Sequence, residues 1–195
     1  HTRSIKRYIP LAAVIATLIS IAILIAALSF YPIEAEDIFS NIAYGRYIWE
    51  HKAIPSSDIF LFTGPFKTWL YDRMGSSLIF YGVHAVAGFG GILALAWALL
   101  FLAYATPLLW VIRHKGNTTI FLLFLTLIIM ASSYWFMPRS YLYSLVFVSF
   151  FYAILTSAPP EKSANRRYLA LIPLQILWTN LQPSSLFCMF MVGAH

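Results

Sequence analysis

Charge and cysteine are both scarce in this chain of 195 residues. Only 10% of its residues are charged, whereas about a quarter are charged in an ordinary soluble domain, and 61% are hydrophobic. Cys188 is the single cysteine, which excludes a disulfide bond within the chain. This composition excludes an ordinary soluble domain and indicates a protein that is largely surrounded by lipid.

The apolar residues are gathered into about five long runs, and nearly all charges lie in the gaps between them. The runs cover residues 11–30, 91–112, 119–136, 141–154 and 168–181. The first three match the roughly 20 residues with which a helix crosses a bilayer core, and the last two need their flanking residues to do so. The runs lack the alternation of a barrel strand, so we expect an all-α, polytopic transmembrane helix bundle.

Basic residues cluster beside several of these runs. The clusters are Arg3, Lys6 and Arg7; Arg113 and Lys115; and Lys162, Arg166 and Arg167. Short loops rich in Lys and Arg are typical of the cytoplasmic side. We therefore expect a multi-pass integral membrane protein with a cytoplasmic N-terminus. The same distribution explains the net charge of +6 by contact with the bilayer, and we expect no nucleic-acid partner.

The longest polar stretch, residues 32–75, is predicted to be the first extracytoplasmic loop. Within it, 36–51 reads as an amphipathic helix, because Ile38, Ile42, Gly45 and Trp49 form one stripe at helical spacing. Such a helix beside a bilayer lies in the interface, roughly parallel to the membrane plane. Asp37, Asn41 and Tyr44 fall on another side of it.

The apolar segment 74–86 is short for a span and is followed by Gly88, Gly90 and Gly91, which we expect to break it. As an interfacial or half-inserted helix, it leaves all three basic clusters in the cytoplasm. Asp37, Arg139 and Asn180 then share the external face. The alternative, in which 74–88 is a full span, inverts the later loops.

Two parts of the chain resemble a bacterial and archaeal membrane group of the GT-C superfamily, the glycosyltransferases that use polyprenyl-phosphate sugars. The first is the pattern D-x7-G-x2-I from Asp37 to Ile48, followed by I-P-x2-D-x-F-x-F-T at 54–63 and by Trp69. The second is an Arg in a turn between two spans, here Arg139, with Trp-Thr-Asn-Leu at 178–181. The resemblance implies sugar transfer from a polyprenyl-phosphate donor at the external face of a bacterial or archaeal plasma membrane.

The resemblance also implies roles for individual residues. An acid at the start of the first external loop serves as base or metal ligand; Asp37 is the candidate, with Glu36 and Glu34 as second acids. Arg139 is the candidate partner of the donor phosphate, because guanidinium pairs well with phosphate. The further candidates for substrate binding are Asn180, Gln182, Asp58, Asp72 and Arg73. Asp37 would also hold a divalent cation, Mg²⁺ or Mn²⁺, where the reaction uses one.

Several candidates also have a structural interpretation. Glu34, Glu36 and Asp37 lie at the entry and in the first turn of the predicted helix, where the helix dipole favours anions. Arg139 at the end of a span is expected to extend its side chain to the membrane interface. Asp58 in a turn is expected to cap its own backbone. Asp72-Arg73 is a plain surface pair, and Asn180 satisfies backbone groups near the Pro183 break.

The chain departs from the pattern of the group at three places. It has Asn41 where the group often has His, Asp72-Arg73 where it often has His-Glu, and Gln182-Pro183 where it often has His-Gly. These departures keep a non-catalytic membrane scaffold open as an alternative, beside a transporter or flippase. We expect residues 1–195 to be one transmembrane domain, the N-terminal part of a longer protein.

Overall fold

A computed structural model describes residues 11–29, 36–60, 73–157 and 168–193. Every regular element in these ranges is helical, which confirms the all-α prediction for the described residues. The elements are α1 (Leu11–Leu28), α2 (Glu36–His51), α3 (Met74–Arg113), α4 (Thr118–Ser132), the 3-10 helix η1 (Ser133–Trp135), α5 (Tyr141–Ser157), α7 (Leu171–Leu181), the 3-10 helix η2 (Pro183–Leu186) and α8 (Phe187–Gly193).

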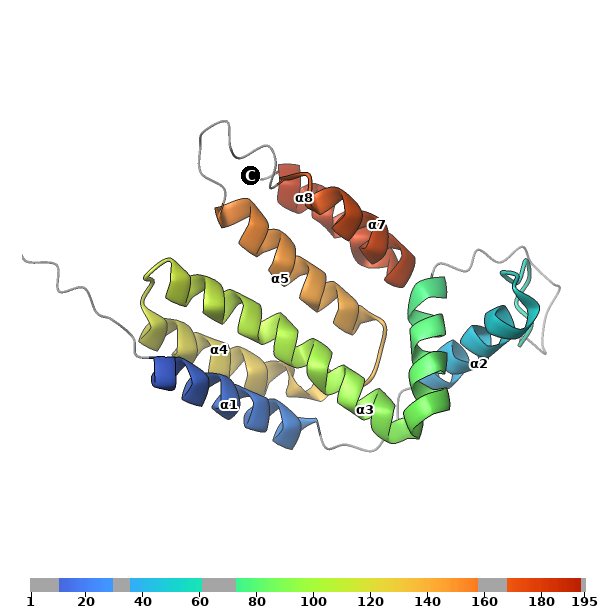
Figure 1. The fold of residues 1–195 in the computed structure, drawn as a ribbon, viewed down its shortest axis with the longest axis horizontal. Coiled ribbons are helices and arrows are strands. Elements are labelled where there is room, and N and C mark those ends of the chain that lie inside the picture. Colours follow the sequence, from blue (N-terminus) through green and yellow to red (C-terminus); the bar gives the residue numbers. More distant parts are fainter. Residues whose placement is uncertain (1–10, 30–35, 61–72, 158–167, 194–195) are drawn as a thin grey trace, which may run out of the picture.

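Helix α3 is the central element of the molecule. It contacts α1, α2, α4, α5 and α7, and successive long helices run in opposite directions along the bundle (Figure 1). Helices α3 and α4, the latter continued by η1, are long and apolar enough to cross a membrane. Helices α1, α5 and α7 are shorter apolar helices.

A sharp kink at Gly88 divides α3 into two parts. The φ of Gly88 is 60° and its ψ is −154°, a conformation that is almost confined to glycine because it has no Cβ. The predicted break at Gly88 is thus confirmed, but Gly90 and Gly91 lie within the helix after it. The first part of α3 turns away from the bundle, and α2 packs against this part at the bundle end (Figure 1).

Helix α2 has the predicted bounds, 36–51, and buries Ile38 and Gly45 of the predicted stripe, but its buried side extends towards Asn41 and Tyr44 and leaves out Trp49. Ile38, Asn41, Tyr44 and Ile48 are buried, while Trp49 is 57% exposed. An apolar stripe alone would decide the buried side of a helix that contacts only lipid, whereas α3 packs against this helix. Asn41 is tolerated on the buried side because its Oδ1 accepts a hydrogen bond from the Ser77 hydroxyl at 3.0 Å.

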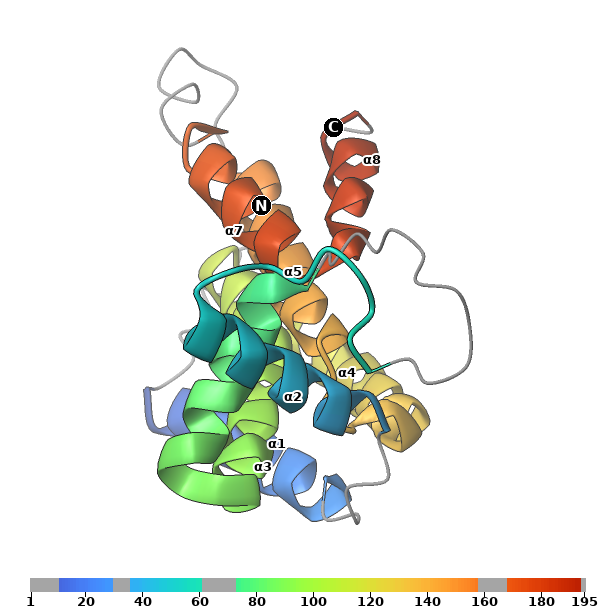
Figure 2. The same cartoon turned by 90° about the vertical axis from the view of Figure 1, so that its right-hand side faces the viewer.

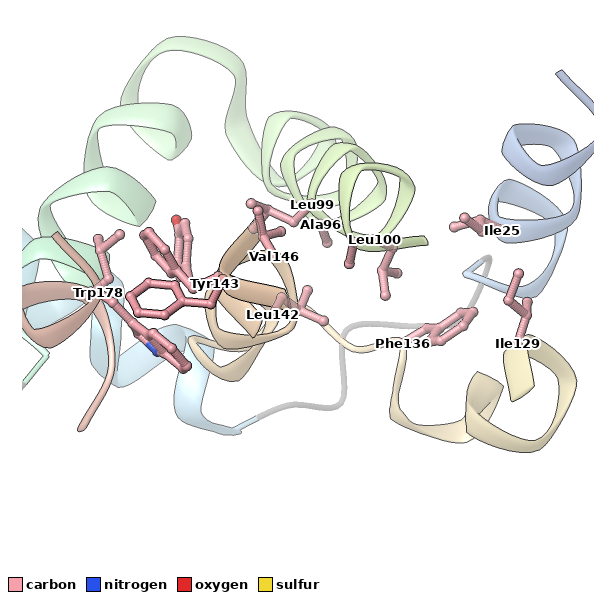
Figure 3. Close-up of a cluster of buried hydrophobic side chains, with 14 of the residues drawn as sticks. Ile25, Ala96, Leu99, Leu100, Ile129, Phe136, Leu142, Tyr143, Val146 and Trp178 are labelled. Atoms are coloured by element: carbon pink, nitrogen blue, oxygen red, sulfur yellow. The ribbon is translucent and has the colours of Figure 1, made fainter. Parts of the chain in front are cut away.

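The core runs the length of the bundle and includes side chains from α1, α2, α3, α4, α5, α7 and α8, part of which Figure 3 shows. Trp178 on α7 is fully buried. Its ring stacks on Phe147 with centroids 5.5 Å apart, and its Nε1–H donates to the Ser144 hydroxyl at 2.9 Å. These contacts hold the C-terminal end of α7 against the first turns of α5.

The outer faces of the bundle helices are apolar as well. On α4, six large apolar side chains are each more than half exposed: Ile120, Leu123, Phe124, Leu127, Ile128 and Met130. A contiguous apolar surface of this kind is unusual on a soluble monomer. It matches the requirement for a helix surrounded by lipid tails.

Candidate functional site

Four segments that the sequence separates widely meet at one end of the bundle. They are the start of α2, the start of α3, the turn before α5 and the end of α7 (Figure 2). Three side-chain or backbone contacts connect these segments or the elements that follow them, and each involves a residue at or within two positions of a predicted site residue.

The first contact joins α2 to the turn before α5. Arg139 Nε lies 3.8 Å from Asp37 Oδ2, with side-chain exposures of 32% and 51%. This distance is short enough for an ion pair but too long for a hydrogen bond. The buried Nε of Arg139 has no hydrogen-bond partner among the described residues. The structure therefore brings together the two main candidates, the base and the phosphate partner, which lie about a hundred residues apart in the sequence.

Local packing positions both of these side chains. Asp37 lies in the first turn of α2, beside Ile38, which is completely buried. Arg139 lies between two buried residues, Pro138 and Ser140, and its carbonyl accepts from the Leu142 N–H at 3.1 Å, where α5 begins. Each charged residue thus sits next to an anchored neighbour, which limits how far its backbone can move.

The second contact joins α3 to α7. A Cβ placed on Gly75 would lie 2.7 Å from the carbonyl oxygen of Asn180, so the two backbones touch. The Asn180 side chain is exposed and donates to the Ile176 carbonyl at 2.8 Å. Asn180 therefore lies at the same end of the bundle as the start of α3, with its amide oriented along its own helix.

The third contact joins α5 to η2 and places Gln182. The hydroxyls of Ser144 and Ser184 lie 2.7 Å apart, which holds the residue after the Gln182-Pro183 break against the second turn of α5. The Oε1 of Gln182 is buried and has no hydrogen-bond partner among the described residues. It is an acceptor that a ligand hydroxyl would satisfy.

Asp58 and Arg73 take part in local structure. Asp58 Oδ1 accepts from the Tyr44 hydroxyl and from the Phe60 N–H at 3.0 Å, as the local-cap interpretation of Asp58 describes. Arg73 precedes α3, and its carbonyl accepts from the Ser76 hydroxyl and the Ser77 N–H, each at 3.0 Å. Their roles in substrate binding stay predictions.

The remaining candidates lie outside the described part of the chain. Glu34 and Asp72 fall in undescribed segments, and only the backbone of Glu36 is described, as the first residue of α2. The residues 61–69 that complete the first-loop pattern are also outside the described residues.

Sequence reasoning missed Tyr141. It is the first residue of α5 and follows the turn that carries Arg139. Its hydroxyl is buried and has no hydrogen-bond partner among the described residues. The only signal in the sequence was its position two residues after Arg139, which does not show whether the hydroxyl finds an acceptor.

The described residues do not fit a metal site. They contain no group of three His, Cys, Asp or Glu side chains arranged to hold an ion. The one described candidate ligand, Asp37, already faces the positive charge of Arg139. A divalent cation at that oxygen would be repelled by the guanidinium, so we derive no catalytic step through a metal. The metal prediction itself stays a prediction, because Glu34 and the Glu36 side chain are not described.

Comparison of the chain with models of known protein families, with curated proteins and with solved structures gave no match.

Proposed function

We propose that this protein is a membrane glycosyltransferase of the GT-C type. In this proposal it transfers a sugar from a polyprenyl-phosphate donor at the extracytoplasmic face. The observation that carries the proposal is the approach of Asp37 and Arg139, with 3.8 Å between Oδ2 and Nε. A carboxylate and a guanidinium are the groups that the reaction needs, one to take a proton and one to bind phosphate.

The proposed membrane arrangement is multi-pass with a cytoplasmic N-terminus. Its support is the direction of the helices. Helix α3 ends at Arg113 on the side of the bundle far from α2 (Figure 1), and a basic loop there suits the cytoplasm. The end that carries Asp37 and Arg139 would then be external, with α2 and the first part of α3 lying across the membrane surface.

The proposed reaction is a direct displacement at the anomeric carbon of the sugar. An acceptor hydroxyl attacks that carbon, its proton passes to the Asp37 carboxylate, and the new bond between carbon and acceptor oxygen forms. The bond between the carbon and the phosphate oxygen breaks, and the electron pair leaves with the phosphate. Arg139 stabilises the charge that develops on this phosphate.

Base and leaving group must lie on opposite sides of the anomeric carbon in such a displacement. The pairing of Asp37 with Arg139 is therefore a resting arrangement in this proposal. The donor phosphate replaces the Asp37 carboxylate beside Arg139, which frees the carboxylate to face the acceptor. The length of the pair supports this exchange, because a separation of 3.8 Å without a hydrogen bond holds the two groups weakly.

Gln182 and Asn180 are the proposed partners of the sugar hydroxyls. Gln182 Oε1 has no donor among the described residues, and a hydroxyl would supply one. Asn180 is exposed at the end of α7, next to the start of α3, and its side-chain carbonyl is an available type of acceptor.

The test is transfer of a radiolabelled sugar from a polyprenyl-phosphate donor by the purified full chain in lipid nanodiscs. The exposed pair Arg46–Glu50 on α2, 2.8 Å apart, offers a matched control: Arg46→Gln should keep the transfer rate and Arg139→Gln should lower it. Movement of the lipid donor across a proteoliposome membrane without a new glycosidic bond would favour the flippase alternative. Absence of both activities would favour the scaffold.

A further inference from the structure

Two buried hydrogen-bond donors without acceptors stand two residues apart where α5 begins. They are the Nε–H of Arg139 and the hydroxyl of Tyr141. A buried donor that finds no acceptor carries the full cost of losing its water. Two such donors in one place indicate that an acceptor from outside the chain completes the arrangement.

The surroundings of Tyr141 do not supply that acceptor. No acceptor among the described residues lies within hydrogen-bond reach of its hydroxyl. The phenol of Tyr104 is bonded to the Ser132 hydroxyl at 2.9 Å and makes no hydrogen bond to Tyr141. Tyr141 thus differs from Tyr104 in having its hydroxyl available.

We infer that the Arg139 Nε–H and the Tyr141 hydroxyl bind one phosphate group together, with Tyr141 as a second donor to the phosphate oxygens. A phosphate offers several strong acceptor oxygens and negative charge, which suits one cationic and one neutral donor. The positive end of the α5 helix dipole adds to the preference for an anion there. The Arg139 side chain as a whole is 32% exposed, so a ligand from the bundle end meets its guanidinium first and reaches the two buried donors when the side chains move.

The inference rests on the proposed function only for the identity of the molecule to which the phosphate is attached. In the transferase, this phosphate is that of the lipid-linked donor, and Tyr141 is a substrate-binding residue. The shared chemistry is a phosphate with at least two free oxygens, so inorganic phosphate and a prenyl phosphate are separate sources that an experiment can tell apart.

The test measures binding of farnesyl phosphate to the full chain in phosphatidylcholine nanodiscs, with farnesol as the matched ligand without phosphate. Tyr141→Phe should weaken farnesyl phosphate binding at least about tenfold, since a hydrogen bond to a charged group is worth that factor or more. Farnesol binding should not change. The melting temperature of the ligand-free variant should stay equal or rise, because the substitution removes an unpaired buried hydroxyl.

Tyr143→Phe is the control variant. The Tyr143 hydroxyl is also buried without a partner among the described residues, but its ring lies against Phe80 on α3, with centroids 5.9 Å apart. Its removal should leave farnesyl phosphate binding unchanged. Displacement by millimolar inorganic phosphate would show that phosphate alone suffices, and lack of displacement would show that the prenyl chain is required; either supports the site.

Unchanged affinity of Tyr141→Phe for farnesyl phosphate would overturn the inference, and so would an equal loss with farnesol or a lowered melting temperature. These readouts need no turnover. A Tyr141-dependent phosphate site in a protein without transfer activity would remove the proposed function alone. Transfer activity with a Tyr141 that is indifferent to phosphate would remove the inference alone.

Discussion

The carbonyl oxygen of Asn180 lies 2.7 Å from where a Cβ on Gly75 would stand. The start of α3 and the end of α7 therefore meet backbone to backbone, and only glycine fits at position 75 without movement. This contact holds the α7 end, with Asn180 and Gln182, beside the elements that carry Asp37 and Arg139.

Gly75→Ala should separate these two backbones. We expect it to lower the free energy of unfolding by about 1–3 kcal/mol, the usual cost of overpacking. Gly82→Ala, in the same part of α3, is the control, because a Cβ there meets nothing within 4 Å. It should be neutral or stabilising by up to about 1 kcal/mol, since alanine favours the helix. Thermal unfolding in detergent measures both; equal stability of the two variants would refute the close contact.

Cysteine labelling should place the two halves of the candidate site on the same side of the membrane. In a Cys188→Ala background, Ser40→Cys on α2 and Tyr134→Cys on η1 should react with an impermeant maleimide from outside. Ser40 is exposed and Tyr134 is 72% exposed. His114→Cys, just after α3, should react only after permeabilisation. Labelling of Ser40→Cys and Tyr134→Cys from opposite sides would exclude the composite site.

Much of the helical framework follows from patterns within short segments. The bounds of α2, the break at Gly88 and the helices within the apolar runs depend on local periodicity and on glycine, which the sequence displays directly. The buried side of α2 does not follow from such patterns, because it depends on which face of α2 packs against α3. Trp49 continues the apolar stripe and yet is exposed, while Asn41 is buried through its bond to Ser77.

In the candidate site, too, local features could be predicted from the sequence and tertiary contacts could not. Asp37 and Arg139 were chosen through a family resemblance and expected on one face, and the structure adds their separation of 3.8 Å. The local bonds of Asp58 agree with its role as a cap, which turn chemistry predicts. Tyr141 could not be found from the sequence, because an unpaired hydroxyl is a property of tertiary packing.

Exchange of the charges at Asp37 and Arg139 should separate a structural role from a catalytic one. Asp37→Arg with Arg139→Asp keeps an ion pair, and a pair this exposed contributes at most about 1 kcal/mol. We therefore expect the double variant to unfold near the wild-type temperature and to lose sugar transfer, because neither group then has its function. The matched exchange, Arg46→Glu with Glu50→Arg, should keep both properties. Recovery of transfer in the Asp37–Arg139 exchange would show that the pair is only structural.

The most direct test of the proposed transferase is the turnover of Asp37→Asn with a lipid-linked sugar donor. An amide keeps the volume of the carboxylate but cannot take a proton, so the rate should fall at least about a hundredfold. Stability should change by less than about 1 kcal/mol, since Asp37 would lose only an interaction with the helix dipole and a long ion pair. Glu50→Gln on the same helix should keep full activity. Wild-type turnover in Asp37→Asn would contradict the account and remove Asp37 as the base.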